Sequence, residues 1–463
     1  MPPASATGPR PSPQAAYAQW VDACTAAGWR ATTAAEPVPV SAALGRVTAA
    51  PVRARWPSPR SACAAMDGIA ISAGSADTAG PVDGVGSAGT ADVWGLAASA
   101  FAWVDTGDPL PEGMDTVVER ERVRFGADGS AQITGPAPRG LNVRARGEDF
   151  PAGQLLIPAG HRLRPADLAG AAAAGHTALE VARRPVAAII PTGDEIRPVG
   201  SALGPGDVTD SNSLLLALRA GEAGARALVS DIQPDDPDAL AAELRRAALA
   251  ADLVLVIAGS SAGRSDHTAA VIGRAGGVAV RGVAVRPGHP VLLGHAGLDG
   301  MRAGQSGRPA AAVPVIGVPG YPLAAAVIFE LFAVPLLAAL QGGRPPHRVW
   351  QRVQLASDWT SSPDVEDWVP VSLTGPAPAA GPAPAAGPAP AAGPAPAAGP
   401  ASPASARADL DDSGAALATP GRHGAGGISR LMRAHAWWPI PIGQGKFARG
   451  DHIDVQLIPG APR

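Results

Sequence analysis

The sequence predicts a multidomain α/β protein built around a doubly wound parallel sheet. Between residues 185 and 340, apolar β-branched runs alternate with helical patterns, which is typical of strand–helix–strand units. Before and after this part, in 36–150, 347–373 and 428–458, short apolar runs are separated by glycine and proline, as in β-rich segments. A chain of 463 residues is also too long for one core, so about three domains are expected.

The central part yields a definite series of elements. We expect strands at 186–190, 227–232, 253–258, 278–285 and 312–318, and helices at 213–223, 237–250, 267–275 and 323–340. A further helix is expected at 14–27, where apolar residues recur at helical spacing. The apolar segment 323–340 is barely long enough to span a membrane and contains Glu330 and Pro335, so we interpret it as a buried helix and expect no membrane association.

Two segments have a composition typical of irregular structure. The unit GPAPAA is repeated from Gly375 onward, and the tract 375–404 is interpreted as a polyproline II or coil spacer inserted into a C-terminal β domain. Residues 73–100 are poor in apolar side chains, so we expect them to contain a mobile loop. Neither segment indicates a function.

Composition excludes several classes of protein. The net charge of −3 gives no basic field, which disfavours binding to nucleic acid. Two cysteines, Cys24 and Cys63, cannot form a disulfide scaffold or a cysteine-based zinc site. The proline-rich N-terminus lacks the apolar core of a secretory signal. A reducing, cytoplasmic setting is therefore expected.

Candidate binding residues follow three of the expected strands, where ligands of doubly wound sheets bind. The first loop contains Thr192, Gly193, Asp194 and Glu195, and the third contains Pro319, Gly320, Tyr321 and Pro322. The second loop, 259–268, is rich in small residues: Gly259, Ser260, Ser261 and Gly263. Their N–H groups could cradle an anion, although an ordinary strand-to-helix turn remains equally compatible. Asp266 then either caps the next helix or faces the ligand.

Acidic residues gather near the same strand ends. These are Asp194, Glu195, Asp235, Asp236 and Asp266. Carboxylates beside a phosphate-binding loop favour Mg²⁺, a hard ion that takes oxygen ligands. For Asp235 and Asp236, a role as helix N-cap is an equally good interpretation, whereas for Glu195 we favour a functional role.

The N-terminal half adds three polar clusters, at 64–70, 105–115 and 142–149. By spacing alone they are turns. Arg144 and Arg146 in the third cluster could nevertheless grip an oxyanion.

Taken in order, these motifs resemble one family. They are AMDGIAI, VDTGDPLPEGMDTVVERE, NVRARGEDFPAGQLLIPAGHRLRPADL, PTGDEI, DSN, DDPDAL, SDHT, RPGHP and GVPGYPLAA. The set is similar to the molybdopterin molybdenumtransferase family, which includes MoeA and the E domain of gephyrin. The similarity runs from about Val40 to Leu340 and continues more weakly over 428–458.

The resemblance implies a four-part homodimer. Its parts would be an irregular α/β segment from 14–50 and 147–184, a β-rich lobe at 51–146, a doubly wound molybdopterin-binding domain at 185–342, and a C-terminal β barrel at 347–463. It also implies that the lobe of one subunit reaches the α/β domain of the other, which makes the active site composite. A molybdopterin adenylyltransferase or a molybdoenzyme is a further partner that the family suggests.

The implied reaction is insertion of molybdate into adenylylated molybdopterin, with Mg²⁺-dependent release of AMP. By resemblance the catalytic residues are Asp67, Thr106, Asp149, Glu195, Asp236 and Asp266, of which the metal would take Glu195, Asp236 and Asp266. The nucleotide-linked pterin would contact Thr192, Gly193, Asp194, Gly259, Ser260, Ser261, Gly263, Pro319 and Pro322. Molybdate is a dianion, which Arg144, Arg146 or Arg286 could attract.

The sequence departs from the family at several of these places. Tyr321 stands where Pro-Gly-Asn-Pro has asparagine, and Gly282, Arg286 and His289 stand where the family has lysines. These changes favour a divergent branch, which could insert tungstate. A carrier or sensor that binds molybdopterin without turnover is a second interpretation, and the retained acids favour the enzyme. A molybdopterin adenylyltransferase is a third, against which the matching N-terminal lobe argues.

Overall fold

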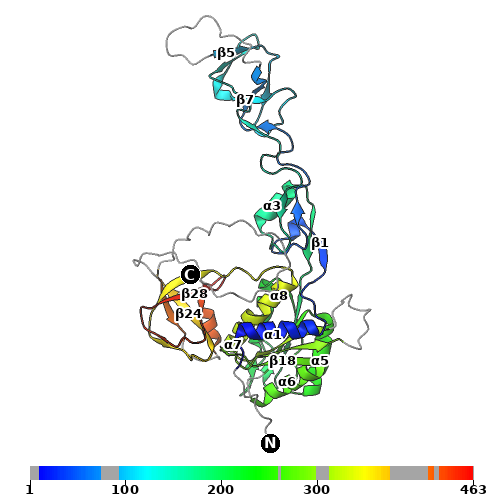
Figure 1. Ribbon diagram of the computed structural model, residues 1–463, viewed down its shortest axis with the longest axis vertical. Helices are drawn as coiled ribbons and strands as arrows, with labels where there is room; N and C mark the ends of the chain where they lie inside the picture. The colour runs from blue at the N-terminus through cyan, green and yellow to red at the C-terminus, as the bar shows by residue number, and fades with distance from the viewer. Residues whose placement is uncertain are drawn as a thin grey trace. The chain divides into compact units, whose positions relative to one another are not determined.

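The computed structural model describes residues 10–74, 93–258, 262–298, 312–375, 416–421 and 427–461, and at 258 and 262–266 it describes only the backbone. The chain forms two compact units (Figure 1). One is Ala35–Ala182. The other joins Met1–Ala34 to Arg183–Arg463.

The second of these units is centred on a six-stranded sheet in the order β16-β13-β17-β21-β20-β18. The strands are β13 (Val186–Pro191), β16 (Arg226–Val229), β17 (Leu253–Ala258), β18 (Gly276–Arg281), β20 (Leu292–Gly297) and β21 (Ala312–Pro319). Neighbours from β16 to β21 run parallel, as the alternating pattern predicts. The doubly wound fold class is therefore confirmed for this part of the chain.

One edge of the sheet differs from the prediction. The expected strand 278–285 is in fact β18 at Gly276–Arg281, and the sequence analysis missed β20. Strand β20 pairs antiparallel with both β18 and β21. It was missed because Gly294 and Gly297 interrupt its apolar run, and glycine is rare in strands. The sheet is thus mixed, although β18 still runs in the same direction as β21.

Helices cover both faces of this sheet. On one face, α5 (Pro237–Ala250) and α6 (Ala262–Ala275) bury their apolar residues against Val186, Ala188 and Ile190. On the other face, α4 (Ser211–Glu222) and the stretch from residue 322 to 340 pack against Ala187 and Ile189. Alternate residues of one strand therefore enter opposite cores, as the pleat requires.

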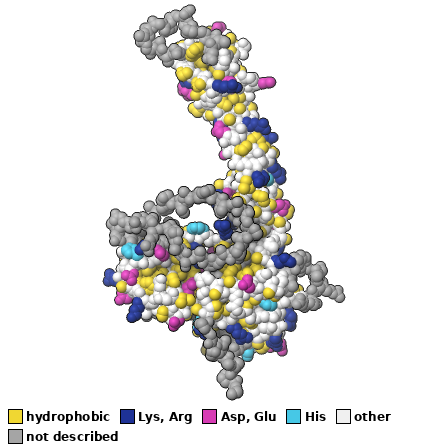
Figure 2. Space-filling view, in the orientation of Figure 1, with side chains coloured by type: hydrophobic (Ala, Val, Ile, Leu, Met, Phe, Trp, Pro, Cys, Tyr) yellow, Lys and Arg dark blue, Asp and Glu magenta, His cyan; other side chains and the backbone are white. Residues whose placement is uncertain are grey.

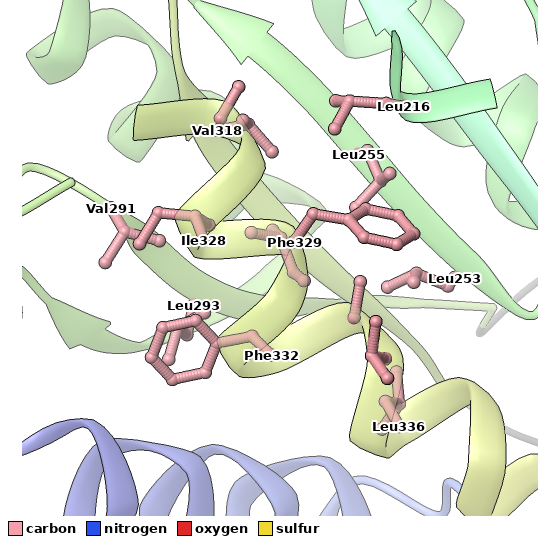
Figure 3. Close-up of a cluster of buried hydrophobic side chains, with 14 of the residues drawn as sticks. Leu216, Leu253, Leu255, Val291, Leu293, Val318, Ile328, Phe329, Phe332 and Leu336 are labelled. Atoms are coloured by element: carbon pink, nitrogen blue, oxygen red, sulfur yellow. The ribbon is translucent and has the colours of Figure 1, made fainter. Parts of the chain in front are cut away.

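The predicted helix 323–340 is an unbroken helical stretch with a π-helical middle. It comprises α7 (Pro322–Ile328), η3 (Phe329–Ala333) and α8 (Val334–Leu340). Figure 3 shows Phe329, Phe332 and Leu336 pointing toward side chains of the sheet such as Leu253 and Leu293. In the described part of the chain, this is the one helix apolar and long enough to cross a membrane, and 83% of its apolar window is buried inside the fold.

Helix α1 (Pro13–Ala26) joins the same core, although it lies far away in the sequence. Ser12 caps its first turn by accepting a hydrogen bond from the N–H of Ala15. The indole N–H of Trp20 donates to the carbonyl of Gly294 at 2.6 Å, which anchors the helix to β20.

The C-terminal part is a closed five-stranded barrel. Its ring consists of β24 (Glu366–Thr374), β25 (Leu417–Pro420), β22 (Trp350–Leu355), β28 (His452–Leu457) and β26 (Ala436–Ile440), and β26 pairs with β24 to close it. A two-residue strand, β19 (Val285–Arg286), extends β24 outward in parallel. Helix α9 (Ile428–Arg433) and the short pair β23 (Trp359–Thr360) and β27 (Lys446–Phe447) complete this part. Most of the predicted spacer, 376–404, lies outside the described residues.

The unit Ala35–Ala182 is built from small sheets. Strand β1 (Ala35–Pro39) pairs with β12 (Ala178–Ala182), and β2 (Val52–Arg53) pairs with β11 (Leu155–Ile157). Two three-stranded sheets follow, β6-β4-β7 and β5-β9-β8, with bounds β4 Gly68–Ile71, β5 Val93–Leu96, β6 Phe101–Val104, β7 Thr116–Glu119, β8 Val123–Phe125 and β9 Ala131–Thr134. Strand β3 (Cys63–Ala64) pairs with β10 (Val143–Arg144), and α3 spans Pro165–Ala173.

The structure leaves two predictions about this unit untested, namely the mobile loop within 73–100 and the boundaries of the lobe. Most of the loop predicted within 73–100 lies outside the described residues, and β5 occupies 93–96 of it. The predicted boundaries of the lobe, at residues 51 and 146, stay a prediction. Strand β2 lies inside these boundaries and pairs with β11, which lies outside them.

Candidate active site

The carboxyl edge of the six-stranded sheet brings the predicted loops together. Strands β13, β17 and β21 are parallel neighbours, so their carboxyl ends meet at one edge. Strand β18 ends at the same edge, because it is antiparallel to β20, which is antiparallel to β21. Ligands of such sheets bind at this edge.

The loop after β13 is held rigidly by hydrogen bonds. The hydroxyl of Thr192 and its N–H each donate to the carbonyl of Ile257 at 3.0 Å, so the side chain is turned into the sheet and buried. Gly193 has φ +145° and donates its N–H to the carbonyl of Gln233. A Cβ atom at Gly193 would come within 2.9 Å of Oε2 of Glu195, so the glycine lets that carboxylate fold back over the loop.

Three of the predicted acids gather around the start of α5. Asp194 accepts a hydrogen bond from the N–H of Asp235 at 3.2 Å. Asp236 caps α5 by accepting from the N–H of Asp238 at 2.9 Å, which is the N-cap alternative that the sequence left open. A small pocket lies beside this cap, and it is lined by Thr192, Pro234, Asp235, Asp236, Pro237, Leu240, His267 and Thr268.

The loop after β21 is fixed by a residue that the sequence analysis did not single out. The side-chain amide of Asn212, in the first turn of α4, donates to the carbonyl of Gly320 at 2.7 Å. Its Oδ1 is buried and has no partner among the described residues. Pro319 ends β21 and Pro322 begins α7, while Tyr321 between them is 48% exposed. Asn212 belongs to the motif DSN, so the motif was the signal that could have identified it.

The second loop falls mainly outside the described residues. Gly259, Ser260 and Ser261 are not described, and Gly263 and Asp266 lie in the backbone of α6 with their surroundings undescribed. The helix assigned to 267–275 therefore begins earlier, at Ala262. His267 and Thr268 of this helix line the pocket; both belong to the motif SDHT, although neither was named as a site residue.

The donors around the pocket suit magnesium in kind. Among the described side chains, no three His, Cys, Asp or Glu residues are placed to hold a metal ion. Asp235 and Asp236 do line the pocket together, and carboxylate oxygens are the ligands that Mg²⁺ prefers. Asp266, a predicted ligand, lies outside this test because its side chain is not described.

The unit Ala35–Ala182 brings two other predicted residues into contact. Asp67, just before β4, accepts hydrogen bonds from the hydroxyl of Thr106 at 2.6 Å and from its N–H at 2.7 Å. These bonds lower the pKa of Asp67 below its usual range, and the bond from the hydroxyl has the largest effect. The result is an exposed carboxylate that stays ionised.

The third cluster of this unit forms a turn. Asn142 has φ +49°, and Arg144 makes an ion pair with Glu148 at 3.4 Å. Arg146 and Asp149 are exposed, and the N–H of Asp149 donates to the carbonyl of Ser58. Of the two arginines in this cluster that were predicted to attract an oxyanion, Arg144 is thus already paired.

The third such arginine is also engaged. Arg286 forms an ion pair with Asp367 of the barrel, and Ser361 donates a hydrogen bond to the same carboxylate at 2.9 Å. Asp367 is only 3% exposed. The pair joins the loop after β18 to β24, which gives Arg286 a structural role, and its role toward an oxyanion stays a prediction.

Known proteins are similar to this chain in both sequence and fold. Residues 12–175 match the MoeA N-terminal region (domain I and II), and residues 188–339 match the probable molybdopterin binding domain. The chain is 33% identical over 339 residues to molybdopterin molybdenumtransferase 2 of Mycobacterium tuberculosis, covering 70% of this chain and 80% of that protein. This chain belongs to the molybdopterin molybdenumtransferase family.

Other members agree with this assignment. A molybdopterin molybdenumtransferase of Nostoc is 31% identical over 316 residues, covering 66% of this chain and 70% of that protein. The crystal structure of a molybdopterin biosynthesis MoeA protein from Pyrococcus horikosii superposes with a TM-score of 0.72 at 25% identity, and it covers 96% of this chain and 98% of that chain. The molybdopterin molybdenumtransferase fold therefore extends through the barrel as well.

Proposed function

We propose that this chain inserts molybdate into adenylylated molybdopterin, with Mg²⁺-dependent release of AMP. Membership in the family makes it a transferase of molybdenum cofactor biosynthesis. The observation that carries the finer step is the carboxyl edge of the sheet. There, Thr192, Gly193 and Asp194 adjoin the pocket that Asp235 and Asp236 line.

Each group at this edge has a role in the proposal. The N–H groups of Thr192 and Gly193 are bonded to the carbonyls of Ile257 and Gln233. We therefore assign the phosphates to the backbone N–H groups of the loop 259–265, which follows the neighbouring strand β17. Glu195, Asp236 and Asp266 would hold Mg²⁺, which supplies positive charge to the pyrophosphate when bound. Asp236 keeps one carboxylate oxygen on the N–H of Asp238, which leaves the other oxygen for a ligand.

The proposal also includes a homodimer with a composite site. The Asp67–Thr106 pair of one copy would complete the site formed by the sheet edge of the other. This supplies an ionised carboxylate that can orient the attacking water. We further propose a cytoplasmic location and hand-over between this chain and an adenylyltransferase or a molybdoenzyme. On the face seen in Figure 2, basic and acidic side chains are interspersed, as expected for small-molecule substrates.

A single-turnover assay tests the reaction. Protein loaded with adenylylated molybdopterin and Mg²⁺ is given molybdate or tungstate, and AMP release and metal retained on the pterin are measured. Oxyanion-dependent AMP release supports the insertase and identifies its metal. Tight binding without AMP release under either oxyanion would contradict it and favour a carrier or sensor, with Tyr321 and Gly282 as the first residues to revert.

Two substitutions test the proposed metal ligands. Glu195→Gln and Asp266→Asn should lower AMP release by about two orders of magnitude or more while the oligomeric state stays unchanged. Asp358→Asn is a suitable control, because that acid lies on the barrel and accepts a backbone hydrogen bond from Arg449. Full activity of both site variants would overturn the metal assignment.

Mixed dimers test the composite site. Asp67→Asn and Glu195→Gln should each be inactive alone. If one site takes Asp67 from one copy and Glu195 from the other, a mixed dimer regains one intact site, so random mixing restores about a quarter of wild-type activity. No recovery would show that both residues serve a site within one copy, or no common site.

A further inference from the structure

The loop that connects β18 to β20, residues 282–291, belongs to the same edge as the proposed phosphate-binding loop. Strand β18 runs in the direction of β21 because two antiparallel pairings separate them. Residue 282 therefore follows the carboxyl end of a strand, as residues 192 and 320 do. A charged group held on this loop faces the region in which a ligand of this sheet binds.

A segment from the start of the chain is held against this loop. The carbonyl of Pro11 accepts a hydrogen bond from the N–H of Ala284 at 2.9 Å, and Pro13 is buried. Gln14 contacts Glu366 at 3.4 Å, and α1 is anchored further along by the bond from Trp20 to Gly294. The placement of Arg10 thus follows from a docked backbone.

The side chain of Arg10 lies directly over Gly282. A Cβ atom at Gly282 would come within 3.2 Å of Nε of Arg10 and within 3.1 Å of the carbonyl oxygen of His289. Gly282 also has φ +76°, which L side chains rarely adopt. Glycine at this position is what lets the guanidinium approach the loop.

The group formed by Arg10, His289 and the Gly282 turn carries a positive charge without a partner among the described residues. Among the described residues, no carboxylate lies within ion-pair distance of Arg10. The other arginine of the loop, Arg286, is neutralised by Asp367. Burial, and in addition the positive charge of Arg10, lowers the pKa of His289 below its usual range. An uncompensated guanidinium beside a neutral imidazole donor favours an anion.

We propose that the side chains of Arg10 and His289 bind a tetrahedral oxyanion at the carboxyl edge of the sheet, beside the Gly282 turn, whose own N–H groups are bonded within the protein. The site would use a cation brought in by the N-terminal segment, and Gly282 would make room for it. For the identity of the anion this inference rests on the proposed function: molybdate or tungstate on the one hand, or a phosphate of the nucleotide on the other.

Titration calorimetry on the full-length protein, without the pterin substrate, tests the site. The probes are sodium tungstate, sodium molybdate and inorganic pyrophosphate. Arg10→Ala should weaken binding of the favoured probe about tenfold, and Arg10→Lys should weaken it less because a charge remains. Arg226→Ala is the matched control, since Arg226 is an exposed arginine at the amino end of β16, on the opposite edge of the same sheet. It should bind as the wild type does.

The outcomes separate the possible sources of the anion. Loss confined to tungstate and molybdate assigns the metal oxyanion, and loss confined to pyrophosphate assigns the nucleotide phosphates. Unchanged binding of all three probes by Arg10→Ala, or equal loss in Arg226→Ala, overturns the site. Thermal unfolding of each variant shows whether the fold is kept, and His289→Lys added to Arg10→Ala should recover binding by returning a cation to the loop.

The calorimetric test of this site and the single-turnover assay of the proposed reaction can fail independently. If the wild type releases AMP but binds no probe at Arg10, this inference fails and the insertase stands. If it binds tungstate through Arg10 but releases no AMP, the insertase fails and the oxyanion site stands.

Discussion

Thr106 directs both its hydroxyl and its backbone N–H at one oxygen of Asp67, at 2.6 Å and 2.7 Å. The two residues lie 39 positions apart, one before β4 and the other after β6. Two donors on one carboxylate oxygen favour its charged form, which lowers the pKa of Asp67. The turn that ends β6 thus fixes both the orientation and the ionisation of a proposed catalytic group.

We predict that Thr106→Val raises the pKa of Asp67 toward its usual range, because valine keeps the N–H donor and loses the hydroxyl. The acid limb of the pH–rate profile should move to higher pH, and AMP release should fall about tenfold. A pH titration followed by carbon NMR of labelled aspartate measures the pKa directly. Thr106→Ser keeps the hydroxyl and should behave like the wild type.

The lowered pKa of Asp67 also makes the stability of the folded protein depend on pH. A lowered pKa in the folded state stabilises the fold above the pKa of the unfolded chain, and this contribution disappears as the pH falls through the folded value. Thr106→Val should therefore lose less stability on acidification than the wild type does. An unchanged titration of Asp67 in the valine variant would contradict this account.

Gly193→Ala should strongly reduce activity without unfolding the protein. The added methyl group would meet Cγ1 of Ile196 at 2.8 Å and Oε2 of Glu195 at 2.9 Å, so the carboxylate must move. We expect AMP release to fall at least about tenfold, because a small displacement of a catalytic group is costly. Gly200→Ala is the control: it has φ +90° and nothing within 4 Å of the new atom. Equal loss in both variants would assign the effect to backbone strain alone.

The sequence predicted the fold best where hydrophobic pattern determines it. The alternation of apolar runs correctly predicted the parallel strands of the six-stranded sheet, since the central strands β13, β17 and β21 send side chains into the cores on both faces. It failed at β20, where Gly294 and Gly297 interrupt the apolar run and Gly294 lets this strand approach the backbone of Gly277 in β18 closely. Closure of the barrel through β24 and β26 depends on long-range pairing, and here it was the family resemblance that predicted it.

The site was predictable as a list of residues but not as contacts. Asp67 and Thr106 were both candidates, yet no spacing rule indicates that one would hold the other. Asn212 was overlooked because its partner is a carbonyl 108 positions away. Arg286 was chosen for its charge alone, and its pairing with Asp367 depends on how the barrel packs. Side-chain partners distant in sequence are decided by tertiary packing, which periodicity does not encode.

Cys24 should be inert in the folded protein. Its thiol is buried beside Trp20 and lies 3.8 Å from the carbonyl of Gly294, and burial raises its pKa to about 12. At pH 8 only about one thiol in ten thousand would be ionised. In a Cys63→Ser background, iodoacetamide should label Cys24 only after the protein unfolds in urea. Rapid labelling under native conditions would show that α1 detaches from the sheet.

A buried carboxylate links the doubly wound part to the barrel. Glu330, 8% exposed in the π-helical segment η3, accepts a hydrogen bond from Arg219 of α4 at 2.7 Å and lies 3.5 Å from Arg348. Arg348 in turn donates to Gln456 of β28 and lies 5.6 Å from the ring centre of Trp368 in β24. One acid therefore neutralises two cations from two parts of the chain.

Glu330→Gln should lower the free energy of unfolding by about 3 kcal/mol, because Arg348 would lose its counter-charge and Arg219 would keep only the exposed Glu222. Glu222→Gln is the matched control, since Glu222 pairs with the same Arg219 but is 63% exposed, and it should cost less than about 1 kcal/mol. Urea unfolding monitored by tryptophan fluorescence measures both. If the two variants were equally stable, the acid at position 330 would contribute no more than a surface ion pair, and the barrel would be held by β19 and its apolar contacts instead.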